Sequence, residues 1–149
     1  MRSGAYLVTS RAVSKSSPFI AVVDDEESVL KALERLLRSA GFDVEKFGSG
    51  AEFLRALDDR IPTCLVLDLH MPQITGFEVQ SRLAARHSGV PVVVITGQDS
   101  SEARERAIEG GAAAYLRKPV EGQALLDAVA RAIQEGPPPS GRLKTINPE

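Results

Sequence analysis

Three aspartates that could hold a cation follow short apolar segments of this sequence. Asp24 and Asp25 come directly after residues 19–23 (FIAVV), and Asp68 comes directly after residues 64–67 (CLVL). Apolar runs of this length are typical of strands that are buried on both faces of a sheet. Three clustered carboxylates repel one another unless a cation joins them, and oxygen ligands of this kind favour Mg²⁺ over Zn²⁺. The pattern therefore predicts a magnesium site built from strand ends.

Two further groups would complete a site for phosphoryl transfer. Thr96 follows the apolar run VPVVVI and offers a hydroxyl, and Lys118 follows the strand-like residues 113–116 and offers a positive charge. The metal and the ammonium would offset negative charge on the oxygens of a phosphoryl group. Asp68 would then be the nucleophile and would form an acyl phosphate. The backbone carbonyl of His70, two residues later, is expected to be a further ligand of the metal.

Each of these five side chains also has a purely structural explanation. Asp24 and Asp25 could begin a helix, because acidic residues are favoured at helix N-termini. Asp68 could be a solvated strand end, Thr96 could cap the next helix, and Lys118 could be an ordinary surface lysine. The coincidence of matching side chains at four strand ends favours one common site. The sequence contains no P-loop, G-x-G-x-x-G, H-E-x-x-H or C-x-x-C pattern that would point to another chemistry.

The elements that must position these side chains alternate along the chain. Five strand-like segments are each followed by a helical pattern, so the chain is expected to read β-α five times. Helix-length crossovers imply parallel strands with right-handed connections. We therefore predict an α/β fold with a five-stranded parallel sheet of order 2-1-3-4-5 and helices on both faces, a flavodoxin-like three-layer sandwich. In that order strands 1, 3, 4 and 5 are neighbours, so their ends converge.

Local signals place the boundaries of several helices. Gly41 is expected to end the first helix as a left-handed C′ residue. Ser49 is a predicted N-cap for the second helix, and Glu52 is expected to complete a capping box with it. The helix over residues 102–110 has few apolar residues, which predicts a loosely held, movable element.

Composition indicates one globular domain. The chain has 149 residues, of which 43% are hydrophobic and 26% charged, enough for one sizeable core. We predict a flexible extension over residues 1–17, one folded domain over 18–135 and a proline-rich linker or tail over 136–149. Because only about ten residues follow the prolines, the chain is either a stand-alone domain or one cut from a longer protein.

Charge and cysteine content limit the cellular location and the binding partners that are expected for this chain. Residues 19–135 contain 19 acidic and 13 basic residues, an acidic balance that argues against direct nucleic-acid binding by this domain. No apolar run is long enough to span a membrane, and the N-terminus lacks the apolar core of a signal peptide. Cys64 is the single cysteine and is expected to be a buried small hydrophobe. A cytoplasmic location is the resulting expectation.

These segments resemble the receiver domain of bacterial two-component response regulators. The matching pieces are VVDDEESVL, LVLDLHMPQITGFEV, VVVITG, GGAAAYLRKPV and the closing amphipathic helix, which together cover about residues 19–135. The pieces FGSGAEFL, PTCLVLD and VITG are most similar to the FixJ-type subgroup, whose outputs often bind DNA. His70 and Gln73 stand where other residues are commoner in the family.

The resemblance implies a role for each residue of the acidic site. Asp68 would be the phosphoacceptor and Lys118 the phosphate contact. Asp25, Asp68 and the His70 carbonyl would bind Mg²⁺ directly, and Asp24 would help through water.

The resemblance also implies a switch next to the phosphate. Thr96 and Tyr115 would be the switch pair, and His70 and Gln98 would flank the phosphate and tune its hydrolysis. The Lys118–Pro119 bond is cis in such domains, whereas base frequencies alone favour trans.

As a receiver domain, the chain is expected to take a phosphoryl group from the phosphohistidine of a sensor histidine kinase or a histidine phosphotransfer protein. It would promote only its own phosphorylation and dephosphorylation and would have no other enzymatic activity. Phosphorylation would change the face formed by residues 100–135, through which the domain controls a homodimer, a partner or an output domain, with transcriptional control as one possibility.

Three alternatives remain open from sequence. A phosphohydrolase with an aspartate nucleophile typically needs a second aspartate two residues after the first, and here that position is His70. A receiver-like interaction module that never takes phosphate would not need the complete set of acids, hydroxyl and lysine. A flavodoxin-type cofactor module would need a Ser/Thr/Gly-rich phosphate loop after the first strand, where this chain has acids.

Overall fold

The chain was analysed as a computed structural model that describes residues 18–136. Five strands and five helices alternate in this part of the chain, as the sequence predicts. The predicted extension over residues 1–17 and all but the first residue of the predicted tail lie outside the described residues.

The strands form one parallel sheet of order β2-β1-β3-β4-β5, which confirms the predicted strand order. The strands are β1 (Ile20–Val23), β2 (Val44–Phe47), β3 (Cys64–Asp68), β4 (Val92–Thr96) and β5 (Ala114–Arg117). Every residue of β1, β3 and β4 is buried, whereas β2 and β5 lie at the edges and are partly exposed.

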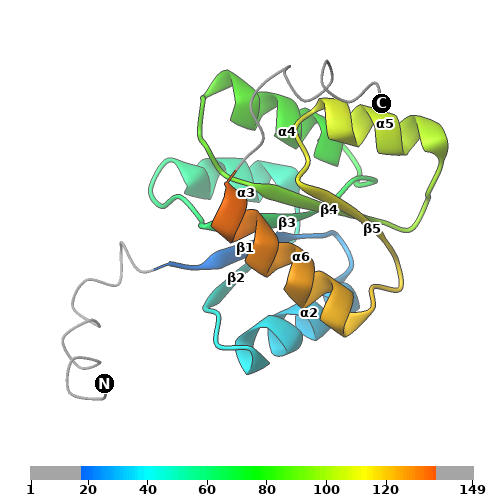
Figure 1. The fold of residues 1–149 in the computed structure, drawn as a ribbon. Coiled ribbons are helices and arrows are strands. Elements are labelled where there is room, and N and C mark those ends of the chain that lie inside the picture. Colours follow the sequence, from blue (N-terminus) through cyan, green and yellow to red (C-terminus); the bar gives the residue numbers. More distant parts are fainter. Residues whose placement is uncertain (1–17, 137–149) are drawn as a thin grey trace.

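Helices cover both faces of this sheet and make the predicted three layers (Figure 1). They are α2 (Glu27–Ser39), α3 (Gly50–Leu57), α4 (Gly76–Ala85), α5 (Ser101–Glu109) and α6 (Gly122–Glu135). Helices α3, α4 and α5 pack on one face, and α2 and α6 pack on the other.

Alternation along each central strand divides the core between the two faces. In β3, Leu65 and Leu67 pack toward α3, α4 and α5, whereas Cys64 and Val66 pack toward α2 and α6. Successive strand residues point to opposite faces, so a strand buried on both sides must be apolar throughout. The Cys64 side chain is fully buried, as predicted, and burial raises the pKa of its thiol to about 12.

The predicted helix boundaries are confirmed, with one correction. Gly41 follows the end of α2 with a φ of 96°, a left-handed conformation that glycine adopts without strain. The Ser49 hydroxyl accepts a hydrogen bond from the Glu52 N–H at 3.1 Å, as expected for an N-cap. The Glu52 carboxylate, however, accepts from the Gly48 N–H at 3.0 Å rather than from Ser49. The second hydrogen bond of the motif therefore joins Glu52 to Gly48, the residue before the N-cap, and not to the N-cap Ser49 itself.

Helix α5 is held by few apolar contacts, in agreement with its sequence. Ala103 and Ala107 are its buried residues, and both side chains are small. Ile108 is 40% exposed. Within residues 18–136, none of the helices has the length and apolar character needed to cross a lipid bilayer.

Candidate functional site

The candidate site lies at the carboxyl edge of the sheet, where parallel strands place their last residues side by side. Val23 pairs with Leu67, so Asp24 and Asp68 follow at adjacent strand ends. Asp68 itself pairs with Ile95. The next residue, Thr96, pairs with Arg117, and the Lys118 N–H donates to the Thr96 carbonyl at 2.8 Å.

Three aspartates meet at this edge as the sequence predicts. Carboxylate oxygens of Asp24, Asp25 and Asp68 all lie within 4.8 Å of one another. Asp24 and Asp68 are buried, at 0% and 2% exposure, whereas Asp25 is exposed. The cluster therefore has two buried acids at its base and one acid on its solvent side, which leaves it accessible to an ion.

Lys118, which directly follows the edge strand β5, extends its ammonium to the two buried acids. Its Nζ lies 2.9 Å from Asp24 Oδ2, 3.3 Å from Asp68 Oδ1 and 3.2 Å from Glu26 Oε1. A lysine ammonium has three N–H donors, so each can face one carboxylate. Glu26 was not predicted as a site residue. Its position directly after Asp25 in the run of four acids was the available signal.

The electrostatics of the cluster favour an added cation. Burial, together with the charges of Asp24 and Asp25, raises the pKa of Asp68 to about 6 against the opposing effect of Lys118. For Lys118, burial acts to lower the pKa, but the close contact with Asp24 and the charge of Asp68 outweigh burial and raise it. One ammonium therefore leaves the three acids only partly neutralised.

The donor atoms of the cluster fit Mg²⁺. Asp24 Oδ1 accepts the Glu26 N–H at 2.9 Å, whereas the buried Asp24 Oδ2 has the ion pair to Lys118 but no hydrogen bond of good geometry. A buried carboxylate oxygen with an unused lone pair is suited to a metal ion or to a water bound to one. All the ligands on offer are hard oxygens, as magnesium requires.

The predicted switch residue Thr96 is fully buried at the end of β4. Its Oγ1 accepts the Gln98 backbone N–H at 3.0 Å and lies 3.1 Å from Nδ1 of His70. His70 is half-buried and the Gln98 side chain is exposed. Both predicted flanking residues therefore contact Thr96, Gln98 through its backbone and His70 through its ring.

Tyr115, the other predicted switch residue, is half-buried on β5. Its hydroxyl donates to Asp99 Oδ1 at 2.9 Å, and the Arg104 guanidinium lies 5.1 Å from the ring centroid. Burial, together with the hydrogen bond and the charge of Asp99, raises the pKa of Tyr115. Asp99 was not predicted, because no local pattern in the sequence pairs it with a tyrosine on another strand.

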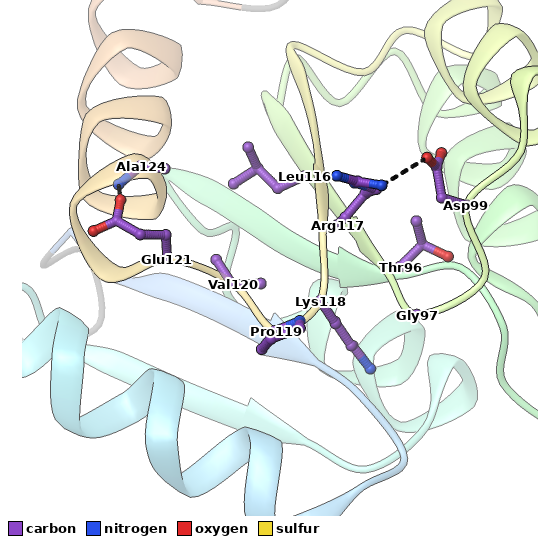
Figure 2. Close-up of a pocket in the computed structure, with 10 residues that line it drawn as sticks. All are labelled: Thr96, Gly97, Asp99, Leu116, Arg117, Lys118, Pro119, Val120, Glu121 and Ala124. Carbon is purple, nitrogen blue, oxygen red and sulfur yellow. Dashed lines mark hydrogen bonds and ion pairs between the residues drawn. The ribbon is translucent and has the colours of Figure 1, made fainter.

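A cavity of about 410 Å³ lies beside this site, between the loop after β4 and the start of α6 (Figure 2). Thr96 and Lys118 line one side of it, and Leu116, Val120 and Ala124 supply apolar surface. The Lys118–Pro119 bond at its rim is cis, as the family resemblance implies and against the general frequency of trans bonds. Figure 2 shows the Lys118 side chain leaving this rim toward the ends of the central strands.

Comparison with known proteins identifies the family. Residues 20–130 match the model of the response regulator receiver domain. The chain is 36% identical over 121 residues to nodulation protein W of Bradyrhizobium diazoefficiens. This match covers 81% of this chain and 53% of that protein. It is 41% identical over 116 residues to the transcriptional regulatory protein PrrA of Mycobacterium tuberculosis, covering 78% of this chain and 48% of PrrA.

The fold agrees with a solved structure of the same family. The crystal structure of FixJ-N superimposes with a TM-score of 0.74 at 33% identity, covering 80% of this chain and 95% of that one. The chain spans about half the length of the two curated relatives named above. With the match over residues 20–130 and the strand order β2-β1-β3-β4-β5, the chain belongs to the response regulator receiver domain family.

Proposed function

We propose that this receiver domain takes a phosphoryl group onto Asp68 and uses the modification as a signal. The observation that carries the proposal is the approach of Lys118 Nζ to Asp68 Oδ1 at 3.3 Å, within a cluster that also brings Asp24 and Asp25 within 4.8 Å of Asp68. A lysine that only stabilises the fold through an ion pair would need one acidic partner. A lysine that faces two buried acids beside an exposed third one is suited to a ligand with several negative oxygens.

The proposed reaction moves one phosphoryl group from nitrogen to oxygen. An oxygen of Asp68 attacks the phosphorus of a phosphohistidine, a P–O bond forms, and the P–N bond breaks with its electron pair returning to the imidazole. Lys118 then pairs with a phosphoryl oxygen in place of the Asp68 oxygen that now carries the phosphoryl group. The Thr96 hydroxyl donates to a second phosphoryl oxygen.

Mg²⁺ would be held by Asp25, Asp68 and the His70 carbonyl, with Asp24 acting through water. Its contribution would be to neutralise charge on the transferring group and on the crowded acids. Asp24 would keep its bond to the Glu26 N–H, which fixes the carboxylate at the start of α2. Because the pKa of Asp68 is raised to about 6, an added positive charge beside it would favour its ionised form.

The signal would pass from Thr96 to Tyr115 and the face formed by residues 100–135. Movement of Thr96 toward the phosphate leaves space into which Tyr115 turns, and α5 can follow because few apolar contacts hold it. The changed face would control a homodimer, a partner or an output domain, with transcriptional control as one outcome. The phosphate donor would be a sensor histidine kinase or a histidine phosphotransfer protein. Because such kinases draw on cytoplasmic ATP, we place the domain in the cytoplasm.

Incorporation of label tests this proposal. Wild type incubated with Mg²⁺ and ³²P-acetyl phosphate, or with a phosphorylated kinase, should take up one acid-stable, base-labile phosphoryl group. Asp68→Asn should take up none, and the exposed control Asp59→Asn should match wild type. Label on Asp68→Asn would refute the assignment of the phosphoacceptor. Multiple turnover of a phosphate monoester by the wild type would point to a phosphohydrolase instead.

A further inference from the structure

His70 lies between the buried hydroxyl of Thr96 and the first turn of α4. Its Nδ1 is 3.1 Å from Thr96 Oγ1, and its ring meets the ring of Phe77 edge to face, with centroids 6.3 Å apart and an interplanar angle of 88°. The same imidazole therefore contacts a residue of the phosphorylation site on one side and a helix on the other.

We propose that His70 is a positioning residue that holds the Thr96 hydroxyl in the unphosphorylated protein and transmits its release to α4 and α5 through Phe77. This inference rests on the proposed phosphorylation of Asp68. It adds a second route from the site to the α4–α5 surface, separate from the route through Tyr115.

The Thr96 hydroxyl has two polar partners in the unphosphorylated state. Its oxygen accepts the Gln98 N–H at 3.0 Å and lies 3.1 Å from Nδ1 of His70. In this proposal His70 is the neutral tautomer in which Nδ1 is the acceptor, so that the Thr96 hydroxyl donates its one proton to Nδ1. The hydroxyl cannot donate that proton to His70 and to a phosphoryl oxygen at once. With this tautomer, donation to a phosphoryl group displaces the bond to His70, so His70 competes with the phosphate for the Thr96 proton.

Phe77 connects the released imidazole to α5. The Arg106 guanidinium of α5 stacks on the Phe77 ring with its carbon 4.0 Å from the ring centroid. The buried Gln80, one turn further along α4, donates from Nε2 to the Ala107 carbonyl at 2.9 Å. Because these contacts join the two helices, a displacement of Phe77 changes the environment of Arg106. Coupling of this kind needs contacts that differ between the two states, and the Thr96–His70 bond supplies one.

Two substitutions separate the hydrogen bond of His70 from its ring. His70→Phe keeps an aromatic ring against Phe77 but lacks Nδ1, whereas His70→Asn keeps a polar atom near the Nδ1 position but lacks the ring. Both leave the backbone carbonyl of residue 70 in place. His87→Asn is the control, because His87 lies beyond the end of α4 with a φ of 51°, a conformation that asparagine tolerates.

The experiment titrates the folded domain with beryllofluoride and Mg²⁺, an analogue of the acyl phosphate, and follows amide and arginine Nε–H resonances by NMR. Loss of one hydrogen bond that competes with the ligand should tighten binding to His70→Phe roughly two- to tenfold. His70→Asn and His87→Asn should bind as wild type does. Because the Arg106 guanidinium lies over the Phe77 ring, the chemical shift of the Arg106 Nε–H depends on the ring current and reports the position of Phe77.

In wild type, beryllofluoride should shift the Arg106 signal. In His70→Phe and His70→Asn this shift should be clearly reduced, while the shift of the Gln98 amide remains. Unchanged or weaker binding to His70→Phe, or an undiminished Arg106 shift in both variants, would overturn the inference. If His70→Phe does not fold, His70→Leu gives the same test of the hydrogen bond. A wild-type domain that binds no beryllofluoride would refute the proposed function itself, and the inference with it.

Discussion

The ammonium of Lys118 reaches the carboxylate of Asp68 across the end of β4, at 3.3 Å between Nζ and Oδ1. The two residues follow β5 and end β3, strands that are not neighbours in the sheet. Asp24 at the end of β1 lies 2.9 Å from the same ammonium. One flexible side chain thus joins the ends of three strands.

Replacing Lys118 should weaken both the fold and the phosphorylation reaction. Lys118→Met leaves Asp24 and Asp68 buried beside each other without their cation. We expect a loss of roughly 1–3 kcal/mol of unfolding free energy at pH 7.5 without divalent ions, measured by urea unfolding. Lys118→Arg keeps the charge and should recover much of this stability, but its wider guanidinium should still slow uptake of phosphate. Equal stability of Lys118→Met and wild type would show that the ion pairs contribute nothing.

The raised pKa of Asp68 predicts how stability depends on pH. The folded state keeps the Asp68 proton up to about pH 6, whereas the unfolded chain releases it near pH 3.8. Between these values the folded state binds more protons, so this residue's contribution to stability falls as pH rises from about 4 to about 6. At pH 7.5 without divalent ions, Asp68→Asn should be more stable than wild type by roughly 1–3 kcal/mol.

Low pH and added Mg²⁺ are two conditions that test why Asp68→Asn should be more stable than wild type. Its advantage should shrink as pH falls toward 4 and should vanish below about pH 3, where Asp68 is protonated in both states. Added Mg²⁺ at pH 7.5 should stabilise wild type more than the variant, because the variant lacks one of the proposed ligands. Urea unfolding at each pH measures both effects. A variant no more stable than wild type at pH 7.5 would contradict the predicted cost of burying the ionised Asp68 beside Asp24.

Gly76 is required by the backbone that carries Asp68. A Cβ at this position would lie 2.4 Å from the Asp68 carbonyl oxygen and 2.8 Å from Leu69 Cα, and neither backbone atom can move freely. Gly76→Ala should therefore cost roughly 1–3 kcal/mol or more of unfolding free energy and should also slow phosphorylation by displacing Asp68. Gly48→Ala is the matched control, because its nearest neighbour would be the flexible Glu52 carboxylate at 4.0 Å. Similar losses in the two variants would refute the explanation.

Asp99 should hold Tyr115 in its present position. Besides burial, the hydrogen bond and the charge of Asp99 raise the pKa of the tyrosine hydroxyl. Asp99→Asn removes that charge and should lower the pKa of Tyr115 toward its ordinary value. Absorbance titration at alkaline pH measures this, in a Tyr6→Phe background that leaves Tyr115 as the titrating tyrosine. An unchanged pKa would show that Asp99 does not restrain Tyr115.

The sequence alone determined the layered fold and the five side chains gathered at the sheet edge. Apolar runs such as CLVL are compatible with a strand buried on both faces, and helix-length connections force such strands to be parallel. The carboxyl ends of parallel strands lie at the same edge of the sheet. Residues that directly follow the apolar runs of neighbouring strands, such as Asp24 and Asp68, therefore lie close together. This inference needs only local periodicity and the topology of the sheet.

Tertiary structure decided the contacts between side chains of different elements. Glu26 facing Lys118, Asp99 facing Tyr115 and His70 facing Thr96 each depend on how loops and helices pack beyond the strand ends. The cis bond before Pro119 is likewise not favoured by local energetics and was expected only from the family resemblance. Short-range patterns record which face of an element is buried. They do not record which long side chain reaches which partner, because that depends on distances set by the assembled fold.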